Sequence, residues 1–140
     1  MRYVMVIDLK RCIGCYGCQI ACKSENATPP GVFWARVLKQ EAGKFPNVRR
    51  SSLPLLCMHC QDPACQQVCP TGATTKSDNG IVEVDSDECV GCRYCMMACP
   101  YKARSFVHED LTDQKPYAPR GKGTVEGCTL CVHRIDAGGI

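Results

Sequence analysis

The sequence has little with which to build an ordinary apolar core. Only 6% of its 140 residues are aromatic, so we expect something besides side-chain packing to hold the fold together. No apolar run approaches the roughly 18 residues that cross a bilayer, which predicts a chain that does not itself span a membrane. An acid interrupts the apolar start after a few residues, at Asp8, which argues against a signal peptide. Without such a signal, there is no direct case for disulfide bonds.

A strong charge of one sign is also lacking. The 17 Lys and Arg residues stand against 14 Asp and Glu residues, which gives a formal net charge of +3. The basic residues are scattered without an aromatic stacking platform, so we expect no nucleic-acid partner. No Ser-His-acid constellation and no phosphate-binding glycine loop is apparent, so we expect no catalytic residue in this chain.

Cysteine, in contrast, is abundant, with 14 residues in four clumps. The clumps that begin at Cys12 and Cys89 have the spacing C-x2-C-x2-C-x3-C, which is that of paired ferredoxin iron–sulfur sites. The clump from Cys57 is a variant, C-x2-C-x4-C-x3-C, and the last contains only one C-x2-C pair. The pattern predicts an electron carrier whose candidate cluster-binding, and therefore metal-binding, residues are Cys12, Cys15, Cys18, Cys22, Cys57, Cys60, Cys65, Cys69, Cys89, Cys92, Cys95, Cys99, Cys128 and Cys131.

A crossing rule assigns these ligands to clusters. In paired ferredoxin sites, three cysteines of one run bind one cubane and the fourth crosses to the cubane of the partner run. The rule predicts two complete central sets: Cys57, Cys60, Cys65 with Cys99, and Cys89, Cys92, Cys95 with Cys69. It predicts two outer sets that each lack one ligand: Cys12, Cys15, Cys18, and Cys22, Cys128, Cys131. We therefore expect four [4Fe-4S] clusters and a natural chain that continues beyond Ile140.

Other uses of cysteine fit the spacing less well. Structural zinc also uses C-x2-C pairs, but it does not require a third cysteine at +6 and a fourth at +10. Three cysteines on one tight loop cannot all form disulfides of acceptable geometry. Thioredoxin-like chemistry needs one such motif rather than many. An iron–sulfur sensor stays open as an alternative, although sensors rarely need a chain of clusters.

Residues 7–22 and 84–99 align without a gap, which is an internal repeat. In each copy we expect a short strand, at residues 3–9 and 81–85, to lead into the cysteine loop, and a short helix to begin in the four residues after the third cysteine. Gly14 and Gly91 lie inside these loops, where the missing Cβ lets the backbone wrap closely round a cofactor and direct its N–H groups at sulfur.

Turn signals predict the remaining elements. The Asp-Asn-Gly centre of residues 74–84 predicts a β-hairpin. Two further strands are predicted within the insertion, at residues 31–40 and 48–56, whereas residues 108–127 are polar and rich in Pro and Gly, which predicts a loop.

Together these patterns predict an α+β fold of two pseudo-symmetric bacterial ferredoxin-like [4Fe-4S] modules with short β-hairpins, helices and long inserted loops. Residues 52–107 form the central two-cluster module. Residues 1–51 and 108–140 form the second module, which is C-terminally truncated in this sequence, and the two make one iron–sulfur unit over residues 1–140.

The chain resembles the four-cluster iron–sulfur (beta) subunits of the dimethyl sulfoxide reductase family of molybdopterin oxidoreductases, of the polysulfide, thiosulfate, tetrathionate, arsenate or dimethyl sulfoxide reductase type. The resemblance covers nearly the whole chain and depends on four segments: C-I-G-C-Y-G-C-Q-I-A-C-K, L-C-M-H-C-Q-D-P-A-C-Q-Q-V-C-P-T-G-A, D-E-C-V-G-C-R-Y-C-M-M-A-C-P-Y and G-C-T-L-C-V-H-R-I-D-A-G. Nitrate reductase relatives have tryptophan at the position of Cys92, so the cysteine here favours a four-iron cluster.

The resemblance implies a non-catalytic subunit that carries electrons between a quinone-binding integral membrane anchor and a large molybdopterin catalytic subunit in anaerobic respiration. The cluster of Cys12, Cys15 and Cys18 would lie nearest the catalytic subunit, and that of Cys69, Cys89, Cys92 and Cys95 nearest the membrane. It also implies a prokaryotic complex peripheral to the cytoplasmic membrane, with the periplasmic face favoured over the cytoplasmic one. The alternatives are a subunit of a hydrogenase or formate dehydrogenase, and a free polyferredoxin.

A few other residues invite a role near the clusters. His59 is expected either to donate a hydrogen bond toward cluster sulfur or to pack its loop. His133, Arg134 and Lys102 follow cysteine loops, where they could tune a potential by charge or be solvated. Trp34 is expected to serve packing rather than electron relay.

Overall fold

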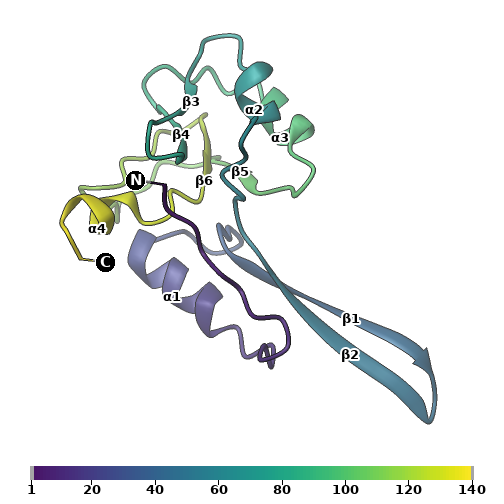
Figure 1. The fold of residues 1–140 in the computed structure, drawn as a ribbon. Coiled ribbons are helices and arrows are strands. Elements are labelled where there is room, and N and C mark those ends of the chain that lie inside the picture. The colour runs from purple at the N-terminus through teal and green to yellow at the C-terminus, as the bar shows by residue number, and fades with distance from the viewer. Residues whose placement is uncertain (1, 140) are drawn as a thin grey trace.

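A computed structural model describes residues 2–139, and Met1 and Ile140, the ends of the expected modules, lie outside the described residues. The elements, in chain order, are α1 (Gly17–Asn26), β1 (Arg36–Lys44), β2 (Asn47–Leu55), α2 (Ala64–Gln67), β3 (Thr74–Lys76), β4 (Val82–Val84), α3 (Tyr94–Ala98), β5 (Arg104–Phe106), β6 (Val125–Gly127) and α4 (Val132–Asp136). Over residues 2–139, the strands form three two-stranded antiparallel sheets, β1-β2, β3-β4 and β5-β6 (Figure 1). This mixed content of short elements confirms the α+β class.

The apolar core is small and lies where β4 meets β6. Its most buried side chains come from the two short sheets and their flanks: Ala73, Ile81, Val82, Val107 and Val125. Such a core stabilises a chain of this size only weakly. No helix in the described part of the chain is both long enough and apolar enough to cross a membrane.

The predicted hairpin of residues 74–84 is confirmed as β3-β4, in which Thr74 pairs with Val84 and Lys76 with Val82. Its turn is closed by two backbone hydrogen bonds, from Ser77 N to Ile81 O at 2.9 Å and from Gly80 N to Ser77 O at 2.8 Å. Gly80 has φ +87°, a conformation that favours glycine over residues with a side chain. Turn chemistry therefore sets the register of this hairpin.

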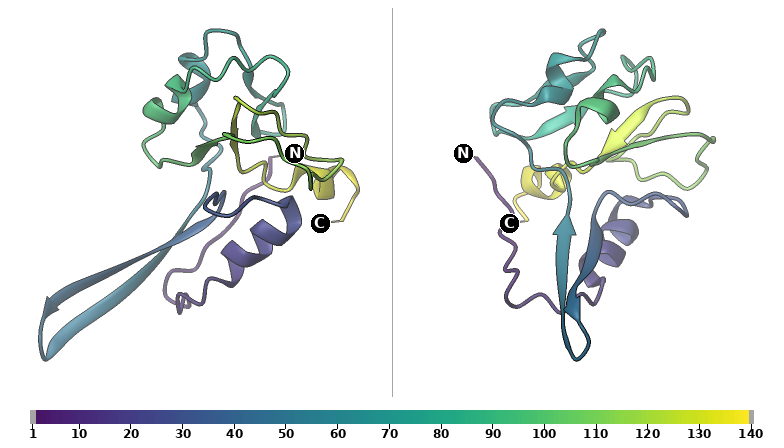
Figure 2. Two further views of the ribbon diagram at one scale, coloured as in Figure 1. Left: turned by 180° about the vertical axis from the view of Figure 1, so that it is seen from behind. Right: turned by 90° about the vertical axis from the view of Figure 1, so that its right-hand side faces the viewer.

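The two strands predicted in the insertion form the long hairpin β1-β2, which projects from the body of the molecule like an arm (Figures 1 and 2). The first strand begins at Arg36 rather than at residue 31. The reason lies in the preceding segment, where Val32 N donates to Pro29 O in a turn. The Lys23 ammonium, in addition, donates to Thr28 O, Pro29 O and Val32 O at 2.8 to 3.0 Å. Carbonyls bound in this way are less available for a strand ladder.

Two predictions of secondary structure were wrong. Residues 3–9 form no strand, because no other strand of the described chain pairs with them, and Val4 and Val6 remain more than 80% exposed. Residues 108–127, predicted as a loop, end in β6, which pairs with β5 from Arg104↔Gly127 to Phe106↔Val125. A carboxylate in the middle of β6 hides its strand character, because Glu126 is buried against Arg120. The sheet β5-β6 joins the central segment to the C-terminal segment.

Candidate iron-sulfur site

All four cysteine loops share one backbone feature. The residue just before the second cysteine has a positive φ in every loop: Gly14 (+68°), His59 (+41°), Gly91 (+68°) and Leu130 (+55°). A left-handed residue at this point curls the loop so that backbone N–H groups turn inward, toward the position of an anion. Sequence reasoning found the two glycines but missed His59 and Leu130, although the C-x2-C spacing places them at the same position. The short fourth clump therefore has the same turn as the complete ones.

The repeat extends into the helices. Tyr16 (φ 62°, ψ 7°) and Arg93 (φ 66°, ψ 7°) occupy the same left-handed conformation just before α1 and α3 begin. Cys18 and Cys95 consequently lie in the first turn of their helices, which begin one residue before the third cysteine of each run rather than, as we expected, after it. α2 begins differently, after Pro63 in an extended conformation, which accommodates the longer spacing between Cys60 and Cys65.

One predicted set of four cysteines lines a single small cavity. Cys69, Cys89, Cys92 and Cys95 surround it together with Thr71, Thr74 and Gly91. The Val125 N–H donates to Cys89 Sγ at 3.4 Å. Burial raises the pKa of the Cys69 thiol, but hydrogen bonds from Thr74 and Thr71 outweigh it, so that the pKa lies below its ordinary value. Donors directed at sulfur in this way favour the thiolate that binds iron.

In the second central set, the cysteine sulfurs accept hydrogen bonds from Arg104 and from the backbone. Arg104 Nη2 lies 3.3 Å from Cys65 Sγ, and Ala103 N donates to Cys99 Sγ at 3.5 Å. Burial raises the pKa of Cys57, and the His59 backbone N–H and the charge of Arg104 oppose the rise, while the Cys65 and Cys60 thiolates add to it. The last two influences show that Cys57, Cys60 and Cys65 are electrostatic neighbours.

The C-terminal cysteines lie beside Cys22. Cys22, Cys128 and Cys131 line an apolar cavity of about 420 Å³, to which Cys18 also contributes. Burial raises the pKa of Cys128 to about 12, and the thiolates of Cys22, Cys57 and Cys131 add to the rise. Two donors are directed at this group, because Leu130 N lies 3.4 Å from Cys128 Sγ and Asn26 Nδ2 lies 3.7 Å from Cys22 Sγ. The structure thus brings Cys22 to the cysteines with which the crossing rule groups it.

The first loop lies nearest the arm. Cys15 and Cys18 are exposed and Cys12 is partly exposed. The arm covers the loop from one side, since Lys39 Nζ lies 4.4 Å from the centre of the Tyr16 ring, and a Cβ added at Gly14 would overlap Ser52 Oγ. The glycine is therefore required both by its φ and by the close approach of β2.

Across residues 2–139, no three Cys, His, Asp or Glu side chains are close enough to hold one metal ion. Four thiolates on a single zinc, with Zn–S bonds of about 2.3 Å, would have to converge closely. In a cubane each cysteine binds a different iron, so its ligands can be more widely spread. None of the 14 cysteines, all of which lie within residues 2–139, is paired in a disulfide bond.

Arg104 provides a test of whether an anionic cofactor fits. Arg104 is only 7% exposed, and within the described chain it forms no ion pair with a carboxylate. A buried, uncompensated cation is strongly unfavourable. A cluster with its thiolates carries negative charge at the position of Cys65, so iron–sulfur binding would supply the missing counter-charge.

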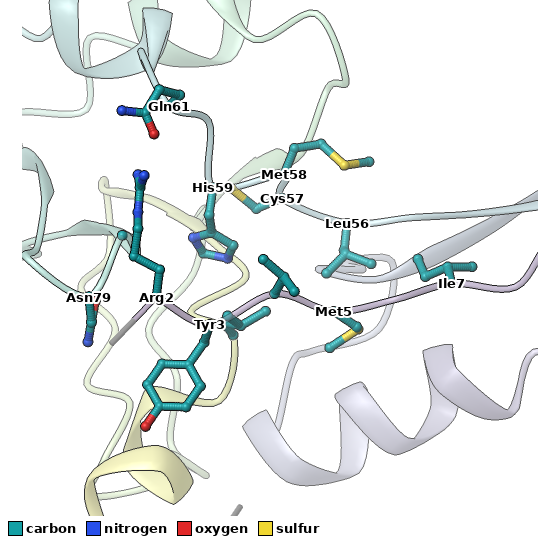
Figure 3. Close-up of a pocket in the computed structure, with 13 residues that line it drawn as sticks. Arg2, Tyr3, Met5, Ile7, Leu56, Cys57, Met58, His59, Gln61 and Asn79 are labelled. Carbon is teal, nitrogen blue, oxygen red and sulfur yellow. The ribbon is translucent and has the colours of Figure 1, made fainter.

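His59 is buried with its imidazole accepting a hydrogen bond at Nδ1 from Val82 N, at 2.9 Å. Burial, aided by the charge of Arg104, lowers its pKa to about 4, so the ring is neutral at pH 7 and its hydrogen is on Nε2. That nitrogen is buried and has no partner in the part of the chain described. The side chain lies between Cys57 and the N-terminal segment in the wall of a groove of about 340 Å³ (Figure 3). The Nδ1 bond gives His59 a packing role, and Nε2–H remains available as a donor.

The structure also describes His133, Arg134 and Trp34, which the sequence analysis named. His133 Nε2 lies 2.8 Å from Glu25 Oε1, and its ring stacks on Tyr117 with centroids 3.8 Å apart. Arg134 is solvated, with 59% of its side chain exposed. Trp34 is 5% exposed and donates to Glu126 Oε1 at 3.0 Å, which confirms its packing role.

Comparison with known proteins identifies the family. The model of the 4Fe-4S dicluster domain matches residues 48–140. The B subunit of selenate reductase from Mesobacillus selenatarsenatis is 43% identical, with 99% of this chain and 54% of the relative covered. The B subunit of tetrathionate reductase from Salmonella typhimurium is 45% identical, with 98% and 51% covered. The arsenate respiratory reductase iron–sulfur subunit of Shewanella sp. is 37% identical, with 99% and 74% covered.

The chain spans about half the length of the first two of these relatives. Over that span, the similarity includes all four cysteine clumps, because it covers 98 to 99% of the chain. The chain belongs to the 4Fe-4S dicluster family, among the iron–sulfur beta subunits of the dimethyl sulfoxide reductase family.

Proposed function

We propose that this chain is an electron-transfer subunit that carries electrons along four [4Fe-4S] clusters between a quinone-reactive membrane anchor and a molybdopterin catalytic subunit in anaerobic respiration. The clusters would supply one-electron oxidation and reduction. The chain would hold them in order, exclude water and set their potentials through N–H groups directed at sulfur. The relatives named as reductase subunits favour this proposal over a hydrogenase or formate dehydrogenase subunit.

The observation that carries the proposal is the grouping of the cysteines: Cys69, Cys89, Cys92 and Cys95 line one cavity, and Cys22, Cys128 and Cys131 line another, to which Cys18 also contributes. Burial is the main cause of the raised pKa of Cys22, Cys128 and Cys95. A thiolate of another set adds to each rise: Cys18 raises the pKa of Cys22, Cys57 that of Cys128, and Cys65 that of Cys95. We propose that the sets follow one another in series: first Cys12, Cys15 and Cys18, then Cys22, Cys128 and Cys131, then Cys57, Cys60, Cys65 and Cys99, and finally Cys69, Cys89, Cys92 and Cys95. A linear series of one-electron centres is what a protein needs to connect two distant redox partners.

The outer module is part of the proposal. Residues 1–51 and 108–140 would form a second two-cluster module, pseudo-symmetric to residues 52–107 and completed by cysteines beyond this sequence. In the central module, β3 follows Cys69-Pro70 and pairs with β4, which precedes Cys89. By the repeat, a strand after the completing cysteines would pair with residues 3–9 and cover Val4 and Val6.

Cysteine substitutions test the ligand sets. Cys22→Ser and Cys131→Ser should each remove the same reducible four-iron signal in electron paramagnetic resonance, because both residues are placed on one cluster. Cys95→Ser is the matched comparison and should remove a different signal. If Cys22→Ser and Cys131→Ser remove different signals, the crossing assignment is wrong.

The arm and the first cysteine loop support a partner subunit at this end of the chain. Phe45 at the tip of the arm is 93% exposed, and Ile13 in the loop is 85% exposed. A free-standing two-stranded hairpin is at best marginally stable in water, so a partner subunit packed against the arm would stabilise it. The resemblance implies that a catalytic subunit would lie next to this loop, so we propose that it contacts the arm. The assembled complex would be peripheral to the membrane of a prokaryote, on the periplasmic face by preference.

Shortening the arm tests that contact. Replacing residues 41–50 with Asn-Gly would close the hairpin after the pair Gln40↔Ser51, with a turn that suits two-residue hairpins. We expect unchanged iron content and at least about tenfold weaker binding to the catalytic subunit, since buried aromatic anchors dominate interfaces. Met97→Ala, an exposed substitution in α3, is the control and should not weaken binding. Equal affinity of the shortened and intact chains would contradict an arm contact.

A further inference from the structure

Arg104 occupies the boundary between the two central cysteine sets. It begins β5, and its guanidinium lies 3.3 Å from Cys65 Sγ of one set. Cys95 of the other set lies in α3, which packs against β5, and the positive charge of Arg104 opposes the burial-driven rise in the pKa of Cys95. One buried cation therefore acts on both sets.

The side chain is held in a place built for it. A Cβ added at Gly127, its partner across the sheet, would lie 3.3 Å from Arg104 Cδ and 3.0 Å from Ala103 O. The absence of a side chain at Gly127 thus leaves room for the stem of Arg104. No carboxylate of the described chain forms a salt bridge with the guanidinium, so its positive charge is not neutralised there.

We propose that Arg104 raises the reduction potentials of the two central clusters, and most of all that of the cluster bound by Cys57, Cys60, Cys65 and Cys99. The inference rests on the proposed iron–sulfur function. Reduction adds one negative charge to a cluster, so a nearby buried cation stabilises the reduced form more than the oxidised form. A charge-assisted hydrogen bond to a ligating sulfur acts in the same direction. Arg104 is a positioning residue for charge, since it touches a cluster ligand rather than a substrate.

A purely structural role would predict something different. If the side chain only fills the space over Gly127, an uncharged side chain of similar length should preserve the potentials. If its charge matters, the potentials should follow the charge and not the volume. The two central clusters should respond unequally, because Cys65 is the one cysteine of the described residues that accepts a hydrogen bond from Arg104.

The test is an electrochemical titration of the cluster-loaded protein, in its complex, followed by electron paramagnetic resonance. In Arg104→Met, the equilibrium constant for reduction of the cluster with Cys65 should fall at least about tenfold, which is a 59 mV lower midpoint for a one-electron couple. The cluster with Cys95 should shift in the same direction by less. Arg104→Lys should restore most of the potential, because it restores the charge.

Arg134→Met is the matched control. Arg134 also follows a cysteine loop, but 59% of its side chain is exposed, so solvent screens its charge and no central midpoint should move. Unchanged midpoints in Arg104→Met, or equal midpoints in Arg104→Met and Arg104→Lys, would overturn the inference. If Arg104→Met fails to retain iron, the midpoints of Arg104→Lys and Arg104→Gln are compared instead, and equal midpoints in these two variants would overturn the inference. Absence of four-iron signals in the unaltered protein would instead contradict the proposed function itself.

Discussion

Gly91→Ala is expected to prevent loading of the cluster assigned to Cys69, Cys89, Cys92 and Cys95. Gly91 has φ +68°, which for a residue with a side chain costs about 1–2 kcal/mol. The larger effect is steric, because a Cβ there would overlap Gly123 O and lie 3.2 Å from the Phe106 ring. Gly123 cannot move away freely, since its N–H donates to Val107 O at 2.8 Å. The cysteine loop would have to leave its place against the β5-β6 sheet.

Gly31→Ala separates backbone strain from this overlap. Gly31 has a similar φ of +82°, but a Cβ there would meet no atom within 4 Å. We expect Gly31→Ala to retain the full iron content with a modest loss of stability, whereas Gly91→Ala should lose one four-iron signal or fail to fold. Iron analysis and circular dichroism of both variants would measure this difference. Full iron loading of Gly91→Ala would contradict the close approach of Gly123.

Glu126→Ala is expected to destabilise the chain by about 3–5 kcal/mol, because it leaves a buried arginine without its counter-charge. Arg120 Nε and Nη2 bind the two Glu126 carboxylate oxygens at 2.5 and 2.6 Å. The same carboxylate accepts the indole N–H of Trp34, and Arg120 also donates to Ala27 O at 3.0 Å. The pair therefore ties β6 to the insertion that follows α1.

The chain offers an exposed pair of the same kind as a control. Arg50 and Glu41 form an ion pair across the arm, but their side chains are 63% and 57% exposed. Glu41→Ala should change the free energy of unfolding by at most about 1 kcal/mol. Denaturant titration of the cluster-loaded protein would compare the two variants. Replacing both buried partners, as Arg120→Met with Glu126→Leu, should recover part of the loss; equal effects of Glu126→Ala and Glu41→Ala would refute the role given to the buried pair.

The cysteine loops were predictable because their chemistry is local. The spacing within each run fixes which cysteines share a turn. The repeat of residues 7–22 and 84–99 is also present in the backbone, because Tyr16 and Arg93 have matching conformations. The grouping of Cys22 with distant Cys128 needed a rule about crossing ligands rather than a pattern. The structure brings Cys22 and Cys128 to one cavity, and their ligation of a common cluster stays a prediction.

The errors have a common physical origin in contacts between distant residues. Residues 3–9 have the composition of a strand, but a strand requires a pairing partner that local composition cannot supply. β6 was missed because the Arg120 contact that buries Glu126 leaves no periodic signal. Arg104 had no sequence feature to single it out, since its importance comes from burial beside Cys65 without a carboxylate. The positive φ of His59 could have been found by aligning each C-x2-C pair.

The most direct test of the account is a redox titration of the anaerobically prepared protein, expressed from its whole natural gene and followed by low-temperature electron paramagnetic resonance. The account predicts four reducible four-iron centres, with magnetic coupling between successive members of the proposed series. Protein that binds zinc stoichiometrically and shows no reducible four-iron signal after anaerobic preparation would contradict it.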